Sequence, residues 1–228
     1  MNAHIFMSTL YSTLLKMTMN NNKKNKKSTL IVMSHFDDET FLMGGYLEKY
    51  FGQDNPNEQA IILTICGYGR GKNIAKNGAI RLAQCKRNAN ELRNVRCYCL
   101  DFQDLTLNNS DIPFIADNVT KLLKTFNPEK VFIMSEGDDH QDHVLTSKGC
   151  KVALHNPERY GIQEIYECPA PYSGLYHNNT PVCNTSLRLS DKVMRAKIRR
   201  SERYSCTENI PKSVYSPYEY FNLIWKRF

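Results

Sequence analysis

The stretch Ser34-His35-Phe36-Asp37-Asp38-Glu39 places four ionisable side chains within five positions, directly after the short apolar run 29–33. An imidazole and several carboxylates at the end of a buried strand are costly to crowd together unless a cation or a reaction uses them. A helix N-terminus is the alternative, because the helix dipole favours Asp and Glu there. That alternative explains Asp37 to Glu39 but not His35, so this cluster alone leaves both interpretations open.

A matching cluster, Ser135-Glu-Gly-Asp-Asp-His-Gln-Asp-His143, follows the apolar run 130–134. His140 and His143 are three positions apart, so one turn of helix would put both rings on one face. A merely solvated loop is the alternative for this cluster. Two such clusters at one edge of a sheet, however, indicate a metal site with two His and one carboxylate as ligands and open positions for water and substrate. Zn²⁺ is the default ion for these ligands, and Fe²⁺ would fit as well.

Apolar runs and stretches of helical spacing alternate five times along the chain. We expect strands over residues 29–33, 60–65, 97–100, 130–134 and 164–168. We expect helices over residues 39–51, 80–92, 112–126 and 143–154, and two more near 191–204 and 217–225. This order predicts one α/β domain over residues 28–228, a Rossmann-like, doubly wound and mostly parallel sheet with helices on both faces. Ligands of such sheets bind at the carboxyl ends of the strands, where both clusters lie.

The first 27 residues carry five Lys and no acid. Their apolar part, residues 5–19, is too short and too often interrupted for a membrane span, and it lacks the features of a signal peptide. We therefore expect residues 1–27 to be a disordered basic extension. An in-frame upstream start and a membrane-surface anchor remain as its two explanations.

The formal net charge of +7 is concentrated at the two ends of the chain. The stretch 28–191 carries 16 Lys+Arg against 20 Asp+Glu, whereas a nucleic-acid binder usually shows a basic face within its fold. We expect no nucleic-acid partner, and neither a peripheral membrane contact nor an oligomeric state is indicated. The eight Cys show no C-x-x-C spacing and are typical of the reduced thiols of a cytoplasmic protein.

The Gly-rich segment 67–72 follows the second expected strand. Its spacing does not fit a dinucleotide or P-loop motif, which argues against a nucleotide site. A flexible lid over the site is preferred, in which Arg70 could meet a phosphate of the substrate.

Both clusters resemble motifs of a known family. His35-Phe-Asp-Asp-Glu39 resembles the His-Pro-Asp-Asp-Glu motif of the PIG-L/LmbE-like zinc-dependent N-acetylglucosaminyl de-N-acetylases, and His140-Gln-Asp-His143 resembles their His-Pro-Asp-His motif. Weaker matches are Leu63-Thr64 with Gly67, Arg81-Leu-Ala-Gln84, Leu100-Asp-Phe-Gln-Asp104 and Tyr218-Glu-Tyr-Phe221. The resemblance spans about residues 28–225.

This resemblance implies a role for each matched residue. The implied metal ligands are His35, Asp38 and His143, with Asp37 as general base. His140 would stabilise the oxyanion or protonate the departing amine, and Asp142 would orient His140. Arg81 would face a substrate hydroxyl or phosphate.

The sequence departs from the family pattern at three of these positions. Phe36 and Gln141 stand where the family has Pro, so both loops lose a fixed φ, although neither Pro carries a reacting group. Gln84 replaces the Glu of Arg-x-x-Glu, which puts the position of Arg81 in doubt.

The implied reaction is hydrolysis of the N-acetyl group of an acetamido sugar of the GlcNAc type or of its conjugate. A divalent metal lowers the pKa of water towards about 7 and polarises the amide carbonyl, and Asp37 directs the water. Two alternatives stay open. The same site could act on another small acyl amide, or the protein could be a non-catalytic binder of a carbohydrate or polyanion.

Overall fold

The computed structural model describes residues 27–52, 58–68, 74–170, 176–177, 180–181, 183–204 and 210–227. Its strands are β1 (Lys27–Met33), β2 (Glu58–Tyr68), β3 (Val95–Gln103), β4 (Lys130–Met134), β5 (Glu164–Cys168), β6 (Tyr176–His177), β7 (Thr180–Pro181), β8 (Thr185–Arg188) and β9 (Tyr218–Lys226). Its α-helices are α2 (Asp38–Phe51), α3 (Ile74–Asn90), α4 (Ile112–Phe126), α5 (Gln141–Ala153) and α6 (Asp191–Ser201). Short 3₁₀ turns cover 109–111, 157–160 and 212–215.

Seven strands form the main sheet, in the order β3-β2-β1-β4-β5-β9-β8. The first five are parallel, and β9 and β8 add antiparallel strands at one side. The first strand, β1, lies in the middle of the sheet, and later strands are added on both sides of it. This arrangement confirms the predicted doubly wound, mostly parallel fold. The order reverses between β1 and β4, so the crevice for a ligand is expected at their carboxyl ends.

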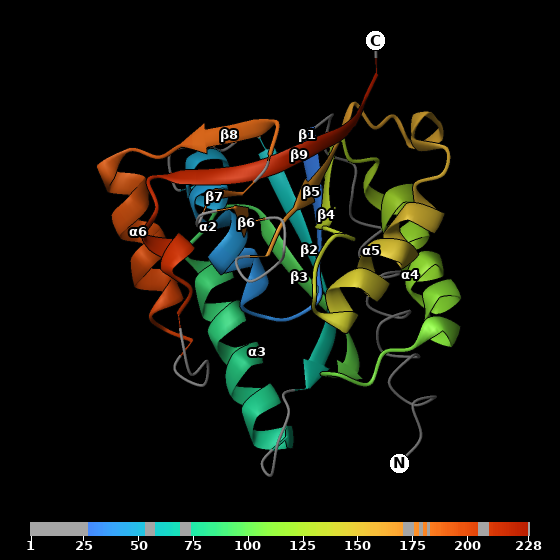
Figure 1. The fold of residues 1–228 in the computed structure, drawn as a ribbon, viewed down its shortest axis with the longest axis horizontal. Coiled ribbons are helices and arrows are strands. Elements are labelled where there is room, and N and C mark those ends of the chain that lie inside the picture. Colours follow the sequence, from blue (N-terminus) through green and yellow to red (C-terminus); the bar gives the residue numbers. More distant parts are fainter. Residues whose placement is uncertain are drawn as a thin grey trace.

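Helices cover both faces of this sheet (Figure 1). On β1, Leu30 and Val32 point into a core shared with α4 and α5, whereas Ile31 and Met33 point into a core shared with α2. This alternation is the two-residue period of a strand that is buried on both faces. It explains why residues 29–33 form a continuous apolar run.

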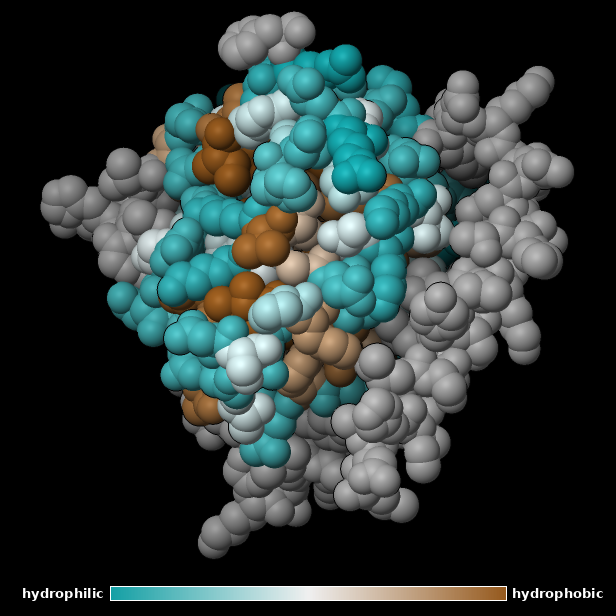
Figure 2. Space-filling view, turned by 90° about the vertical axis from the view of Figure 1, so that its right-hand side faces the viewer, coloured by the Kyte–Doolittle hydropathy of each residue, from teal (hydrophilic) through white to brown (hydrophobic). Residues whose placement is uncertain are grey.

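The outer surface of α4 and α5 lies on the side of the molecule that Figure 2 shows. Hydrophilic side chains cover most of it, with smaller hydrophobic areas between them. No helix among the described residues is long and apolar enough to cross a bilayer.

The predicted strands and helices up to residue 201 are confirmed, with shifted ends. Helix α3 begins at Ile74 rather than at 80, and α6 ends at Ser201 rather than at 204. The expected extension 1–27 lies outside the described residues except for Lys27, which begins β1. The small hairpin β6–β7 and strand β8 were not expected from the sequence.

The predicted helix near 217–225 is wrong, because these residues belong to strand β9. Strand β9 pairs antiparallel with both β5 and β8. Glu219 and Phe221, two positions apart, are buried, as the two-residue period of a strand requires. Aromatic residues are also enriched in strands, so the aromatic composition of this segment should have favoured a strand.

An ion pair buried between α2, α6 and β9 attaches the chain end to the fold. Lys197 Nζ lies 2.9 Å from Glu219 Oε1, and the two residues are 1% and 2% exposed. The Glu219 carboxylate also accepts hydrogen bonds from the backbone N–H groups of Gly45 and Tyr46, each at 2.7 Å. A Cβ at residue 45 would lie 2.6 Å from the δ-carbons of Leu189, so any residue larger than Gly there requires the Leu189 side chain to shift.

Candidate metal centre

The two sequence clusters meet at the carboxyl ends of the neighbouring strands β1 and β4. His35 lies two residues beyond β1, and Asp38 opens α2. His143 lies in the first turn of α5, which follows β4. All three residues are buried, and Ser34 ties the loops together by donating to the hydroxyl of Thr146 at 2.9 Å. The predicted convergence of the two clusters at one edge of the sheet is therefore confirmed.

Three donor atoms form a nearly regular triangle at this edge. His35 Nδ1 lies 3.2 Å from His143 Nε2 and 3.4 Å from Asp38 Oδ2, and the latter two atoms are 3.5 Å apart. Tetrahedral zinc ligands at about 2.1 Å from the ion are about 3.4 Å from one another. The backbone N–H of His35 donates to Asp38 Oδ2 at 2.9 Å and holds this carboxylate in place. The residues present thus fit a tetrahedral divalent cation with one open position.

His140 faces the same space. Its ring centroid lies 4.9 Å from that of His35 and 4.6 Å from that of His143. His35, His140 and His143 can also bring one nitrogen each within 4.8 Å of one another, so a three-His ligand set is geometrically open as well. A third group of this kind combines His35 with Cys66 and Asp104, all of them buried.

His35 and His143 belong to both of the first two sets. In each ring, the nitrogen that points away from the donor triangle contacts a carboxylate. His35 Nε2 lies 3.1 Å from Asp142 Oδ2, and His143 Nδ1 lies 2.9 Å from Asp138 Oδ2. Such partners fix the tautomer and direct the other nitrogen to the metal. Asp138 was missed as a site residue in the sequence, although its place five residues before His143 in the second cluster was a usable signal.

Asp142, expected to orient His140, contacts that residue through its backbone and His35 through its side chain. Its carboxylate bonds to His35 and accepts the backbone N–H of Leu105 at 2.7 Å, whereas its backbone N–H donates to His140 Nδ1 at 3.2 Å. His140 is the N-cap of α5, and the side chain of Asp142, two residues into the helix, turns towards β1. Sequence spacing alone does not show this direction.

Carboxylates dominate the electrostatics around His35. Burial alone would lower its pKa, but hydrogen bonds with Asp142 and Asp38 outweigh burial and raise the pKa to about 10. Burial would raise the pKa of Asp38, but the attraction of His143 and the hydrogen bond with His35 hold it well below its usual range. Burial and the neighbouring imidazoles of His35 and His143 lower the pKa of His140 to about 4. The field at His35 therefore favours positive charge, as a cation site requires.

Asp37 lies at the N-terminus of α2, next to Asp38, and contacts Arg81 of α3. Arg81 Nη2 lies 3.7 Å from Asp37 Oδ2, and Nη1 lies 3.2 Å from Asp104 Oδ2. Asp104, which follows β3, was named in the sequence only as part of a motif and joins the site through this contact. The substrate contact predicted for Arg81 stays a prediction. Arg70 lies outside the described residues.

Both residues that replace family prolines make contacts of their own. Phe36 is 2% exposed and packs with Phe41, Cys85 and Tyr204. The side-chain amide of Gln141 donates to the backbone carbonyl of Leu107. Tertiary contacts thus restrain both loops at the two positions where the family has Pro with its fixed φ.

Known proteins resemble the chain in sequence and in fold. It is 28% identical over 124 residues to the probable N-acetyl-alpha-D-glucosaminyl L-malate deacetylase 2 of Bacillus cereus, covering 52% of this chain and 56% of that protein. The chain thus spans about half the length of the curated relative it matches.

Solved structures share the fold at low identity. The N,N'-diacetylchitobiose deacetylase of Pyrococcus horikoshii matches with a TM-score of 0.67 at 16% identity, over 96% of this chain and 92% of that one. GalB of Pseudomonas putida, a 4-carboxy-2-hydroxymuconate hydratase, matches with a TM-score of 0.59 at 16% identity, over 89% and 98%. The fold therefore occurs with more than one reaction.

A sequence profile gives the family. The profile described as PIG-L, GlcNAc-PI de-N-acetylase, matches residues 30–154, which include both clusters. This match covers more than half of the chain and every residue of the donor triangle. The chain belongs to the PIG-L family.

Proposed function

We propose that this protein is a zinc-dependent deacetylase that removes the N-acetyl group from an acetamido sugar of the GlcNAc type or from its conjugate. The donor triangle of His35, Asp38 and His143 carries the proposal, because its spacing suits a tetrahedral divalent cation. The family and the deacetylases among its relatives support the substrate class. We further propose a cytoplasmic location, in keeping with seven free thiols among the described residues.

His35, Asp38 and His143 would hold the ion, and Fe²⁺ is the alternative to Zn²⁺. When bound, a divalent metal supplies Lewis-acid polarisation of the amide carbonyl and makes water more acidic. Asp37 directly precedes Asp38 of the triangle in the sequence. The guanidinium of Arg81 contacts Asp37 Oδ2. The Asp37 carboxylate takes the proton of the attacking water, and Arg81 keeps this carboxylate directed to the site.

In this proposal, His140 acts on the oxyanion and on the departing amine. Because Nδ1 accepts the backbone N–H of Asp142, the neutral ring carries its proton on Nε2. That N–H is a hydrogen-bond donor for the oxyanion that forms on the acyl carbon, and it can pass a proton to the departing amine.

Metal analysis and acetate release test this proposal together. We expect about one Zn²⁺ per chain, and acetate release from N-acetylglucosamine derivatives that stops on chelation and returns with zinc. Asp37→Asn should lower kcat by about 10²–10⁴-fold with metal content unchanged. Asp139→Asn, an exposed carboxylate of the second cluster, is the matched control and should keep full activity. Full activity of the Asp37→Asn variant would overturn the assigned base.

A panel of acyl donors separates the alternatives. Metal binding without acetate from any acetamido sugar, together with turnover of another acyl amide, would keep the site and replace the substrate. A chain that binds no zinc even after its addition would overturn the enzyme proposal and favour a non-catalytic binding protein.

A further inference from the structure

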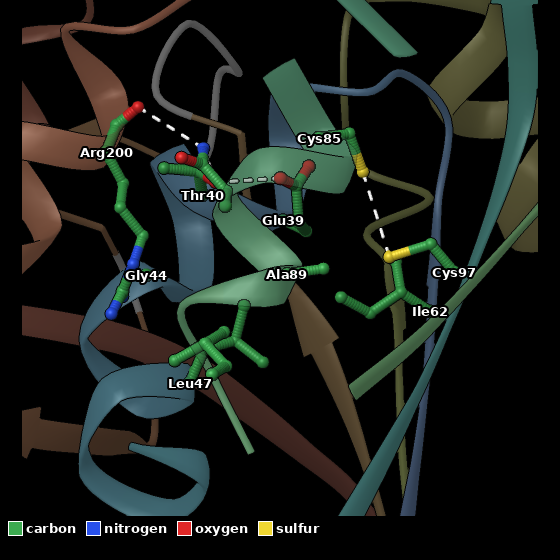
Figure 3. Close-up of a pocket in the computed structure, with 11 residues that line it drawn as sticks. Glu39, Thr40, Gly44, Leu47, Ile62, Cys85, Ala89, Cys97 and Arg200 are labelled. Carbon is green, nitrogen blue, oxygen red and sulfur yellow. Dashed lines mark hydrogen bonds between the residues drawn. The ribbon is translucent and has the colours of Figure 1, made fainter. Parts of the chain in front are cut away.

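Two thiols of neighbouring elements are in direct contact next to the site. Cys85 of α3 and Cys97 of β3 have their sulfur atoms 3.8 Å apart, with the Cys85 S–H donating to Cys97. Cys85 is 1% exposed and Cys97 is half-buried. Figure 3 shows the two sulfur atoms pointing towards each other from their separate elements.

A small cavity adjoins both thiols. Its lining includes Glu39, Asn88 and Arg200 besides Cys85 and Cys97, and its volume of about 10 Å³ is room for about one water-sized molecule. Glu39 Oε2 and Arg200 Nη1 are buried and have no hydrogen-bond partner among the described residues. A molecule the size of water in the cavity would lie among these residues, beside the two thiols.

The contact gives the two thiols different acidities. The hydrogen bond from Cys85, aided by the charge of Lys86, holds the pKa of Cys97 below its usual range, although burial opposes this. The same hydrogen bond, together with burial, raises the pKa of Cys85 well above its usual range. A lower pKa gives more thiolate, which is the nucleophile in sulfur oxidation, so Cys97 reacts first.

We propose that Cys85 and Cys97 form a site of reversible oxidation, at which a peroxide converts the two thiols to a disulfide that joins α3 to β3. The Cys97 sulfur attacks one peroxide oxygen and the O–O bond breaks, which gives a sulfenic acid and, for hydrogen peroxide, one water. The Cys85 sulfur then attacks the Cys97 sulfur, the S–O bond breaks, and a second water leaves with the Cys85 proton. The thiols lose two electrons, and the peroxide gains them.

This disulfide would act on the proposed catalytic site through Arg81. An S–S bond is about 2.05 Å long, so the sulfurs must approach by about 1.8 Å, through a shift of α3, of β3 or of the two side chains. Arg81 lies one helical turn before Cys85 and contacts both Asp37 and Asp104. A shift of this turn moves the guanidinium relative to the Asp37 carboxylate. This effect on activity rests on the proposed function, whereas formation of the disulfide does not.

Mass spectrometry of the zinc-loaded chain tests the site. After treatment with hydrogen peroxide and blocking of free thiols, we expect one linked peptide pair that contains residues 85 and 97, with the mass of two hydrogens lost. Cys85→Ser and Cys97→Ser should each abolish this pair. Cys99→Ser is the matched control, since Cys99 is also half-buried on β3, and this variant should keep the linkage. Absence of the linkage in the native wild-type chain, or its appearance only in denaturant, would overturn the proposal.

Acetate release measured on the same samples tests the consequence. Oxidation should lower kcat at least threefold in the wild type, a thiol reductant should restore it, and Cys97→Ser should resist the loss. A linkage without any change in kcat would overturn the effect on Arg81. If neither sample releases acetate from any acetamido sugar, the deacetylase proposal fails, and the linkage is still decided by the mass.

Discussion

The carboxylate of Asp142 bonds to the imidazole of His35, 107 positions away in the sequence, with 3.1 Å between Oδ2 and Nε2. The backbone N–H of Leu105 donates to the same oxygen at 2.7 Å. Leu105 has a φ of 63°, in the left-handed region that residues other than Gly rarely adopt. The chain therefore accepts a strained backbone at a point where its N–H fixes the carboxylate that fixes His35.

Asp142→Ala is predicted to weaken zinc binding by about 10–100-fold, because His35 loses the partner that directs Nδ1 to the metal. Competition with a chromophoric chelator measures this affinity without any substrate. Asp139→Ala serves as the exposed control and should bind zinc as the wild type does. Unchanged affinity in Asp142→Ala would show that the contact has no role in holding the metal ligand.

Two ligand sets share His35 and His143, and a pair of variants distinguishes them. If Asp38 completes the site, His140→Ala keeps near-stoichiometric zinc and loses catalysis, whereas His143→Ala loses the metal. We expect this result, because His140 Nδ1 already accepts the backbone N–H of Asp142. Elemental analysis of both purified variants, dialysed against the same zinc buffer, measures the difference. Loss of zinc in His140→Ala would assign the three-His set instead.

The sequence was sufficient for the parallel part of the sheet and for the meeting of the two clusters at its edge. Runs such as 29–33 and 130–134 are apolar throughout because both faces of their strands are buried, and the chemistry follows where they end. The convergence of the two clusters at one edge followed from the parallel, doubly wound sheet, since both follow strands of that sheet.

Other features depend on directions that spacing does not encode. The turn of Asp142 towards His35 rather than His140 is set by the start of α5, and the pairing of Arg81 with Asp104 needs the register of β3 against β2. The aromatic segment 218–226 was misassigned to a helix although its aromatic residues favour a strand. Glu219 entered the sequence analysis only as part of the match Tyr218-Glu-Tyr-Phe221, and only the fold shows Lys197 and two backbone N–H groups around it.

Glu219→Gln is predicted to destabilise the fold by about 3–5 kcal/mol, because Lys197 would stay buried without its counter-charge. Urea unfolding followed by circular dichroism measures the loss. The double variant Glu219→Gln/Lys197→Met should recover part of it, since no uncompensated charge then remains. Equal stability of Glu219→Gln and wild type would mean that the pair is not buried in solution.

Restoring the family prolines is predicted to cost little stability at the second motif and much more at the first. Gln141 is the first residue of α5, a position that tolerates Pro because its N–H has no helical partner. The residue before it, His140, has φ −85° and ψ 120°, which suits a residue that precedes Pro. Gln141→Pro therefore loses only one hydrogen bond to Leu107, a cost of about 1 kcal/mol that the fixed φ partly offsets.

Phe36→Pro, by contrast, removes a side chain that is 2% exposed from its contacts with Phe41, Cys85 and Tyr204. The loss of a buried aromatic ring costs about 3–5 kcal/mol, and the new ring does not fill the space. Thermal unfolding of both zinc-free variants isolates this difference from metal binding, with Phe36→Leu as the control that keeps an apolar side chain. A Phe36→Pro variant as stable as Gln141→Pro would mean that Phe36 contributes little to the packing, and that the loop after β1 is held by Asp38 and its neighbours instead.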